Sequence, residues 1–275
     1  MTRRPYRLAR VLSSALAAGT LLTTTACSDD GGTDGSRVSD VAASRVAGKR
    51  QTLSPTATLT TDGARAALIT EADIEDDWTQ VKDTEAENWQ DSLLIGRVDV
   101  SDFLTAKAQA ADCQRLLDSL FDDDLLGRPS GASALRGFEQ GESRLLYQVA
   151  SYERTDPQDS LNWMAGLPDK CDQFTVTDDG EQRTVQVVET SLPDVGDARE
   201  GLRVTVRGTT GGTQATLTLD VAAVRVGDDA ITVTAGGLDG GESGSVGQAV
   251  RLGTQRLKDV LAGKTPTPNP SEFDY

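Results

Sequence analysis

The chain has 275 residues, with 43 acidic against 27 basic side chains and a formal net charge of −16. It contains no histidine, which excludes Ser-His-Asp and Cys-His nucleophilic centres and every zinc site that needs a histidine ligand. The acidic balance argues against nucleic-acid binding, because phosphates attract a basic surface. The length predicts one or two domains.

The first 26 residues have the pattern of a bacterial export signal. Four arginines, at positions 3, 4, 7 and 10, precede a short apolar run over residues 11–22 and then small residues up to Ala26. The run is too short to cross a bilayer core of about 30 Å as a helix. The adjacent Arg3 and Arg4 also fit a twin-arginine signal, so the export route stays open. Removal of residues 1–26 deletes four arginines and no acid, which takes the net charge from −16 to −20.

Cys27 ends the run LLTTTAC, which resembles a lipobox, the signal for attaching a diacylglyceryl group to a cysteine before cleavage ahead of it. Thr25 and Ala26 match this signal, whereas Thr24 stands where leucine is usual. The alternative is an ordinary cleaved signal in which Cys27 is incidental. Because two acyl chains such as palmitate anchor a protein firmly, we expect a lipoprotein held on the extracytoplasmic face of the cell membrane through Cys27.

The composition divides the rest of the chain into a tether, a domain and a tail. Residues 27–63 are rich in Ser, Thr, Gly, Asp and Ala and contain no aromatic residue, which predicts a flexible tether with a root-mean-square span of roughly 30 Å. Residues 263–275 carry three prolines and are predicted to be disordered. The folded domain is therefore expected over residues 64–262.

Three segments of this domain have helical patterns. Thr70 and Asp73 form a capping box that opens a short helix ending near Trp78. The apolar spacing of residues 101–121 predicts a second helix, with Cys113 on its apolar face. The pair Asp156-Pro157 starts a third, since proline is favoured at the first helical position.

Strands and a last helix follow. Apolar and β-branched patterns predict strands over residues 145–152, 174–177, 184–190, 202–206, 213–226 and 231–235. A final helix has its apolar face over residues 246–261, with Gly263 as its C-cap. This order predicts an α+β fold in which a few helices pack on an antiparallel β-sheet.

Cys113 and Cys171 remain once Cys27 is assigned to the lipid. Outside the membrane, two such cysteines most often pair, so we expect one disulfide. The two positions lie 58 residues apart, for which the chain-entropy model gives about 4 kcal/mol. The alternative, a catalytic thiol, needs an activating cation nearby, and Lys170 is a poor substitute for histidine.

Other candidate sites carry little specificity. Asp122, Asp123 and Asp124 offer oxygen ligands for calcium but lack the spaced loop that binds it, and they fit a solvated corner better. Glu139 and Glu142 are a candidate carboxylate pair for glycan hydrolysis, although pairs like this arise by chance in so acidic a chain. We therefore predict no catalytic residue, no metal and no cofactor. If the domain has a ligand cleft, Trp89 and Tyr147 are the first residues to probe.

The order of several motifs resembles a known family. The segments LITEADIEDDW, ADCQRLL and LNWMAGLPDKCDQF, with a strand around Tyr147 between the last two, are similar to the extracellular sensor domain of PknH-type serine/threonine kinases. The resemblance covers residues 64–262. Its most specific elements are the opening with Ile69, Thr70 and Asp73 and the cysteine pair with Trp163 before Cys171.

That resemblance implies a compact α+β sensor domain with a ligand-sized cleft and no established enzymatic activity, which also occurs in stand-alone lipoproteins. Kinase members carry two disulfides, whereas this chain has cysteines for one. No kinase domain or transmembrane helix follows, so a signal would have to pass through another membrane protein.

These observations predict a non-catalytic, membrane-anchored extracytoplasmic lipoprotein that binds or senses an envelope-derived small molecule, peptide or lipid. The alternatives are a carboxylate-dependent hydrolase of cell-wall glycans and a structural partner in an envelope assembly.

Overall fold

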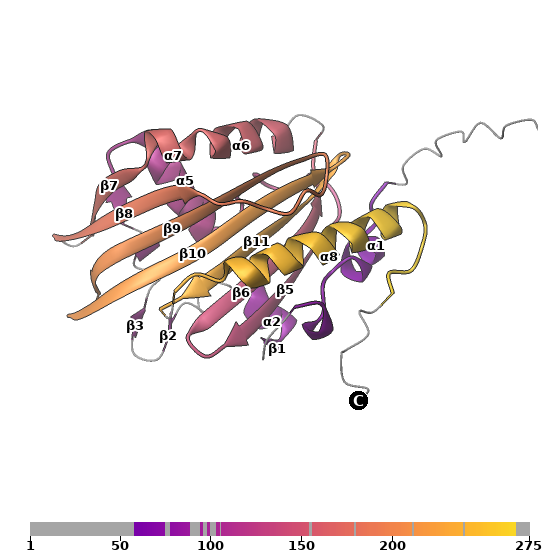
Figure 1. The fold of residues 1–275 in the computed structure, drawn as a ribbon, viewed down its shortest axis with the longest axis horizontal. Coiled ribbons are helices and arrows are strands. Elements are labelled where there is room, and N and C mark those ends of the chain that lie inside the picture. The colour runs from indigo at the N-terminus through magenta and orange to yellow at the C-terminus, as the bar shows by residue number, and fades with distance from the viewer. Residues whose placement is uncertain are drawn as a thin grey trace, which may run out of the picture. The chain divides into compact units, whose positions relative to one another are not determined.

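The computed structural model describes residues 58–74, 78–88, 94–95, 98–99, 103–104, 106–153, 156–178, 180–210, 212–238 and 240–267. Within these residues, nine strands form one antiparallel sheet in the order β1-β5-β6-β11-β10-β9-β8-β7-β4 (Figure 1). Its strands are β1 (Thr79–Gln80), β4 (Lys107–Ala108), β5 (Ser133–Gln140), β6 (Ser143–Ser151), β7 (Gln173–Asp178), β8 (Glu181–Glu189), β9 (Ala198–Thr210), β10 (Thr213–Val226) and β11 (Asp229–Gly237). A separate two-stranded ladder joins β2 (Leu94–Ile95) to β3 (Val98–Asp99).

Helices cover both faces of the large sheet around β10, because that strand is apolar on both sides. In β10, Leu219 and Val221 point to one core, whereas Ala222 and Val224 point to the other. The first core lies under α5 (Ala111–Phe121), α6 (Asp156–Ala165) and α7 (Leu167–Lys170), and we call this side the disulfide face. The second lies under α1 (Thr61–Ala66), the 3₁₀ helix η1 (Glu71–Asp73) and α8 (Ser243–Leu261), and we call it the α8 face. The short α2 (Asp83–Ala86) packs against β5.

The predicted fold class and the six predicted strands are confirmed, and β10 begins and ends where the sequence pattern placed it. The strand β5 was not predicted, because its sequence SALRGFEQ mixes Gly, Arg and Glu with apolar residues. It forms an antiparallel hairpin with β6, and the hydrogen bonds to β6 hold β5 as a strand although its sequence lacks a strand pattern.

Two predicted helices are shorter than expected. The capping box is confirmed, but η1 ends at Asp73 because Ile74 is extended. The helix predicted over residues 101–121 is interrupted: Phe103 and Leu104 are helical, but Lys107 and Ala108 pair with Thr177 and Val176 of β7, and α5 begins at Ala111. The helix from Asp156 is confirmed, as is the last helix, with Gly263 in the left-handed conformation after it.

The packed domain reaches slightly beyond the predicted range of 64–262. Leu59 and Ala64 are buried in the core of the α8 face, and α1 crosses the predicted boundary. Pro266 is buried after α8. In the described part of the chain, no helix is both long and apolar enough to span a membrane.

Candidate functional site

The disulfide prediction is confirmed. The sulfurs of Cys113 and Cys171 are bonded at 2.02 Å, and the bond joins α5 to the residue that follows α7. Both residues are buried in the core of the disulfide face, which removes the alternative of a catalytic thiol. Trp163 of α6 belongs to the same core, and the Arg115 guanidinium lies 3.9 Å from the centre of its ring.

A polar pocket of about 490 Å³ lies on the disulfide face, between α6 and the adjoining ends of β8 and β9. Leu161 of α6 forms an apolar part of its wall, and Gln158 stands one turn earlier. The opposite wall consists of Glu189 at the end of β8, the residues that follow it, and Arg199 and Glu200 of β9. Pockets of this size are typical of small-molecule sites.

Close backbone contact builds this wall. The Thr190 amide donates a hydrogen bond of 2.9 Å to the Gly201 carbonyl. A Cβ atom at Gly201 would lie 2.7 Å from the Thr190 carbonyl oxygen and 2.8 Å from Leu192, so only glycine allows the segment after β8 to fold so closely over β9. Gly201 therefore allows Thr190 and Leu192 to lie directly against β9 in the wall of the pocket.

Two carboxylates dominate the electrostatics of the pocket. Burial raises the pKa of Glu200 above its usual range, and the neighbouring Glu189 raises it further, against a smaller opposing effect of Arg199. The Arg199 guanidinium already pairs with Asp194, with Nη2 2.7 Å from Oδ1. The pocket can therefore accept hydrogen bonds from the hydroxyl, amine or ammonium groups of a ligand.

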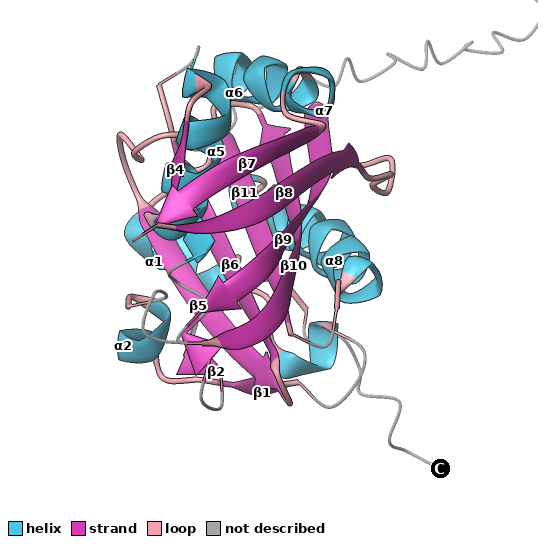
Figure 2. Ribbon diagram, turned by 90° about the vertical axis from the view of Figure 1, so that its left-hand side faces the viewer, coloured by secondary structure: helices cyan, strands magenta, loops and turns pink. Residues whose placement is uncertain are grey.

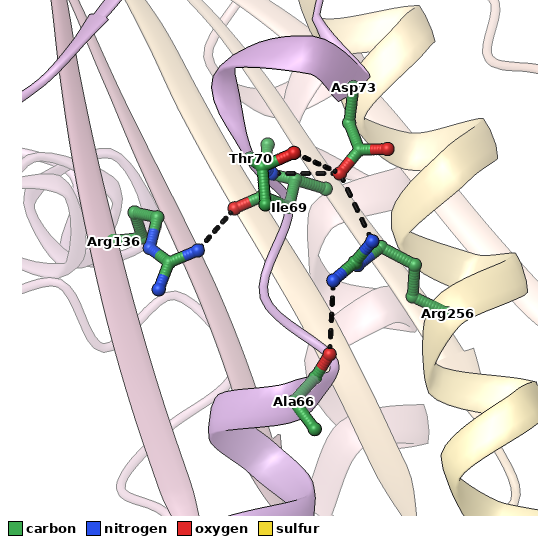
Figure 3. A network of polar contacts seen from close by, with 6 residues as sticks. All are labelled: Ala66, Ile69, Thr70, Asp73, Arg136 and Arg256. Carbon is green, nitrogen blue, oxygen red and sulfur yellow. Dashed lines mark hydrogen bonds and ion pairs between the residues drawn. The ribbon is translucent and has the colours of Figure 1, made fainter. Parts of the chain in front are cut away.

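The α8 face carries a second polar network (Figure 3). Asp73 Oδ2 accepts hydrogen bonds from the Thr70 amide at 2.8 Å and the Thr70 hydroxyl at 2.9 Å, and it lies 3.3 Å from Arg256 Nη1. Arg256 Nη2 also donates to the Ala66 carbonyl at 3.2 Å. From β5, Arg136 Nη1 donates to the Ile69 carbonyl at 2.8 Å. The network holds residues 66–73 against α8 and the sheet.

The two predicted ligand-contacting residues are not brought together in the described residues. Tyr147 is fully buried on the α8 face, where its ring packs against Gly253, and it does not line the polar pocket. Burial raises the pKa of its hydroxyl, which has no hydrogen-bond partner among the described residues. Trp89 and Cys27 lie outside the described residues, so the roles predicted for these three residues stay predictions.

The other acidic candidates lie apart from the pocket. Asp123 follows α5 with a φ of 55°, and burial together with Asp122 and Asp124 raises its pKa to about 8. Glu139 on β5 is exposed and lies 3.9 Å from Arg144, and Glu142 stands exposed in the next turn. Among the described residues, no group of three or more acidic or cysteine side chains is arranged to hold a metal ion.

Sequence reasoning missed Glu189 and Glu200. They are eleven positions apart, and only the β8–β9 register, with Glu189 opposite Leu202, brings them to one pocket. One signal was present in the sequence. Each glutamate continues the inward-facing alternation of its strand, after Val187 in β8 and before Leu202 in β9. An acidic residue in that position is a candidate for a partly buried site.

Comparisons with known proteins give a weak structural likeness. No protein-family model matches the chain, and no curated protein matches it. Among solved structures, the extracellular domain of PknH from Mycobacterium tuberculosis is similar, with a TM-score of 0.35 and 9% sequence identity, over 76% of this chain and 100% of that one. This likeness establishes neither a family nor a function.

Proposed function

We propose that this protein is a lipid-anchored extracytoplasmic lipoprotein whose α+β domain binds a small envelope-derived ligand without catalysing a reaction. The observation that carries the proposal is the Cys113–Cys171 disulfide. Disulfides persist in oxidising compartments outside the cytoplasm, which agrees with the export signal at the N-terminus. With both domain cysteines paired, Cys27 is left as the cysteine for lipid attachment.

The polar pocket is the proposed ligand site. Its volume of about 490 Å³ suits a small molecule or the end of a peptide, and Glu189 and Glu200 favour a ligand that carries hydrogen-bond donors or a positive charge. Because the pocket lies between α6 and the sheet, an occupant would contact both layers at once. Ligand binding would therefore change the packing of α6 on the sheet. We propose that a membrane signalling protein recognises this change on the disulfide face.

One observation favours a second candidate, a hydrolase of cell-wall glycans. A carboxyl group with a raised pKa beside a second carboxylate is the pairing that glycosidases use for general acid and nucleophile or base. In this reading Glu200 is the acid and Glu189 the second carboxylate. Glu139 and Glu142, the pair suggested by the sequence, lie on the exposed β5–β6 hairpin instead.

The anchor is tested by producing the full chain in a bacterial host fed with labelled palmitate. We expect label in the membrane fraction of the wild-type protein and none in Cys27→Ser. Mass spectrometry of protein harvested from the envelope then reports the Cys113–Cys171 pair. An unmodified Cys27 thiol, or free thiols at positions 113 and 171, would refute the proposed export and anchoring.

The ligand site is tested by thermal-shift measurements on the Cys27→Ser chain with amines, amino sugars and wall muropeptides. We expect at least one compound to raise Tm, and Glu200→Gln to weaken that response. Glu139→Gln, an exposed change of the same kind, is the control. If no compound in the panel raises Tm, the result contradicts ligand binding. If the protein turns over muropeptides and both Glu200→Gln and Glu189→Gln abolish this turnover, the result favours the hydrolase.

A further inference from the structure

The outer side of β7, β8, β9 and the start of β10 forms a broad open surface on the α8 face. The helix α8 packs on β10 and β11 (Figure 2). The described side chains of β7 and β8 that alternate to this side are exposed. We call this surface the open face.

The strand register arranges the open face in regular cross-strand rows. One row runs Thr175, Thr184, Arg207, Thr216, and the next runs Gln173, Gln186, Thr205, Thr218. Hydroxyl and amide groups therefore repeat at the spacing between strands, about 4.8 Å. Such groups both donate and accept hydrogen bonds across a flat area.

The charge of the open face is opposite to that of the whole chain. Arg203 and Arg207 lie on it, four residues and therefore about 13 Å apart along β9. The carboxylate beside Arg203 belongs to Asp220, which is buried and accepts two hydrogen bonds of 2.9 Å from Arg203 Nε and Nη2. Arg207 is exposed and forms no ion pair with another described residue. Among the side chains that the structure describes on this face, Arg207 thus adds a positive charge to the surface of a chain of net charge −16.

A pocket of about 460 Å³ adjoins the open face at Arg207. Among the described residues, its lining consists of Arg207, Gln214, Ala215, Thr216 and Leu238, which are one cation, two polar and two apolar residues. Guanidinium groups bind carboxylates and phosphates through paired hydrogen bonds. A ligand that lies across the Thr and Gln rows of the open face could therefore place an anionic group in this pocket, against Arg207.

We propose that the open face and this pocket bind an anionic polysaccharide. The flat array of Thr and Gln side chains fits the hydroxyl groups of sugars, and the unpaired Arg207 fits an acidic group of the polymer. A protein partner fits less well, because protein interfaces are enriched in aromatic residues and methionine. The described residues of the open face include none of these, and Val188 is the one large exposed aliphatic side chain among them. This site is separate from the glutamate pocket, which lies on the opposite face of the sheet.

The test is calorimetric titration of the full chain carrying Cys27→Ser with polygalacturonate. Its methyl ester has the same backbone without the charge and is the matched neutral ligand. We expect polygalacturonate to bind, the ester to bind at least about fivefold more weakly, and added salt to weaken binding. Arg207→Gln should weaken binding about fivefold and Arg207→Glu should abolish it. Arg128→Gln, the same change at an exposed arginine after α5, should leave binding unchanged.

The remaining outcomes contradict the proposal. Polygalacturonate that does not bind, binds as tightly as its ester, or binds equally to wild type and Arg207→Glu would show that the open face is not the site. Tighter binding of poly-glutamate than of polygalacturonate would assign the surface to an acidic peptide instead. Circular dichroism of each variant confirms that the fold is retained, which is expected because Arg207 is exposed.

Discussion

On the disulfide face, a covalent bond between Cys113 and Cys171 ties α5 to the end of α7. On the α8 face, the N-terminal segment from α1 to η1 is held instead by a buried ion pair and by two arginine hydrogen bonds to backbone carbonyls. The covalent link acts mainly by restricting the unfolded chain, whereas the ion pair needs both buried partners in place. Residues 61–73, which lie nearest to the proposed anchor in the sequence, are thus held by non-covalent contacts. The helices α5 and α7 are joined by a covalent bond.

The largest effect on stability is expected from removing the Cys113–Cys171 disulfide. The double variant Cys113→Ser/Cys171→Ser should lower the free energy of unfolding by about 4 kcal/mol, since the bond closes a loop of 58 residues. Urea unfolding with and without reductant measures this. Cys27→Ser is the control and should leave the midpoint unchanged. Equal midpoints for wild type in both conditions would mean that the bond contributes nothing.

On the α8 face, Asp73→Ala should lower the free energy of unfolding by about 3 kcal/mol. The change leaves the Arg256 guanidinium, whose side chain is 13% exposed, without its counter-charge. The same urea experiment reports it, with Asp62→Ala as the control, because Asp62 is exposed and only loosely paired with Arg65. A loss below about 1 kcal/mol would show that the apolar core alone holds the segment.

Asp123 at the end of α5 gives a pH-dependent test on the disulfide face. Its folded pKa of about 8 lies above the ordinary value of 3.8, so the folded state binds the proton more tightly than the unfolded state. Its contribution to stability is complete below pH 4 and is lost as the pH rises through about 8. Asp123→Asn keeps the left-handed conformation and should stabilise the protein by about 2 kcal/mol at pH 9 but not at pH 4.

Thermal unfolding of wild type and Asp123→Asn between pH 4 and 9 checks this sign. The gap in Tm should open as the pH rises, and Asp159→Asn, exposed on α6, should show a constant small difference. A gap that narrows with rising pH would overturn the assignment.

The smallest effect is expected from Tyr147→Phe on the α8 face. The hydroxyl is fully buried and has no partner among the described residues, so its removal should raise the free energy of unfolding by up to about 1 kcal/mol. Ligand responses at the glutamate pocket should not change. A loss of stability would show that the hydroxyl has a favourable partner in the fold, and a lost ligand response would support the ligand contact predicted for Tyr147.

Local sequence patterns were sufficient to predict those elements whose formation depends only on residues close together in the chain. The alternation along β10, the Thr70–Asp73 capping box and Pro157 in the first turn of α6 each act within a few residues. In other segments, the neighbouring strand determines the secondary structure. Residues 107–108 have a helix-compatible pattern but form a strand because β7 offers hydrogen bonds, and β5 exists because β6 folds back on it.

From the sequence alone follow the α+β class, the antiparallel sheet and the pairing of Cys113 with Cys171, because periodicity, turns and a count of cysteines are properties of short segments and composition. Only the tertiary structure decided which side chains meet. The register of β8 and β9 brings Glu189 to Glu200, that of β9 and β10 sets Arg207 beside Thr216, and Arg256 reaches Asp73 from 183 positions away. Such contacts depend on how strands align and helices dock, which no local pattern encodes.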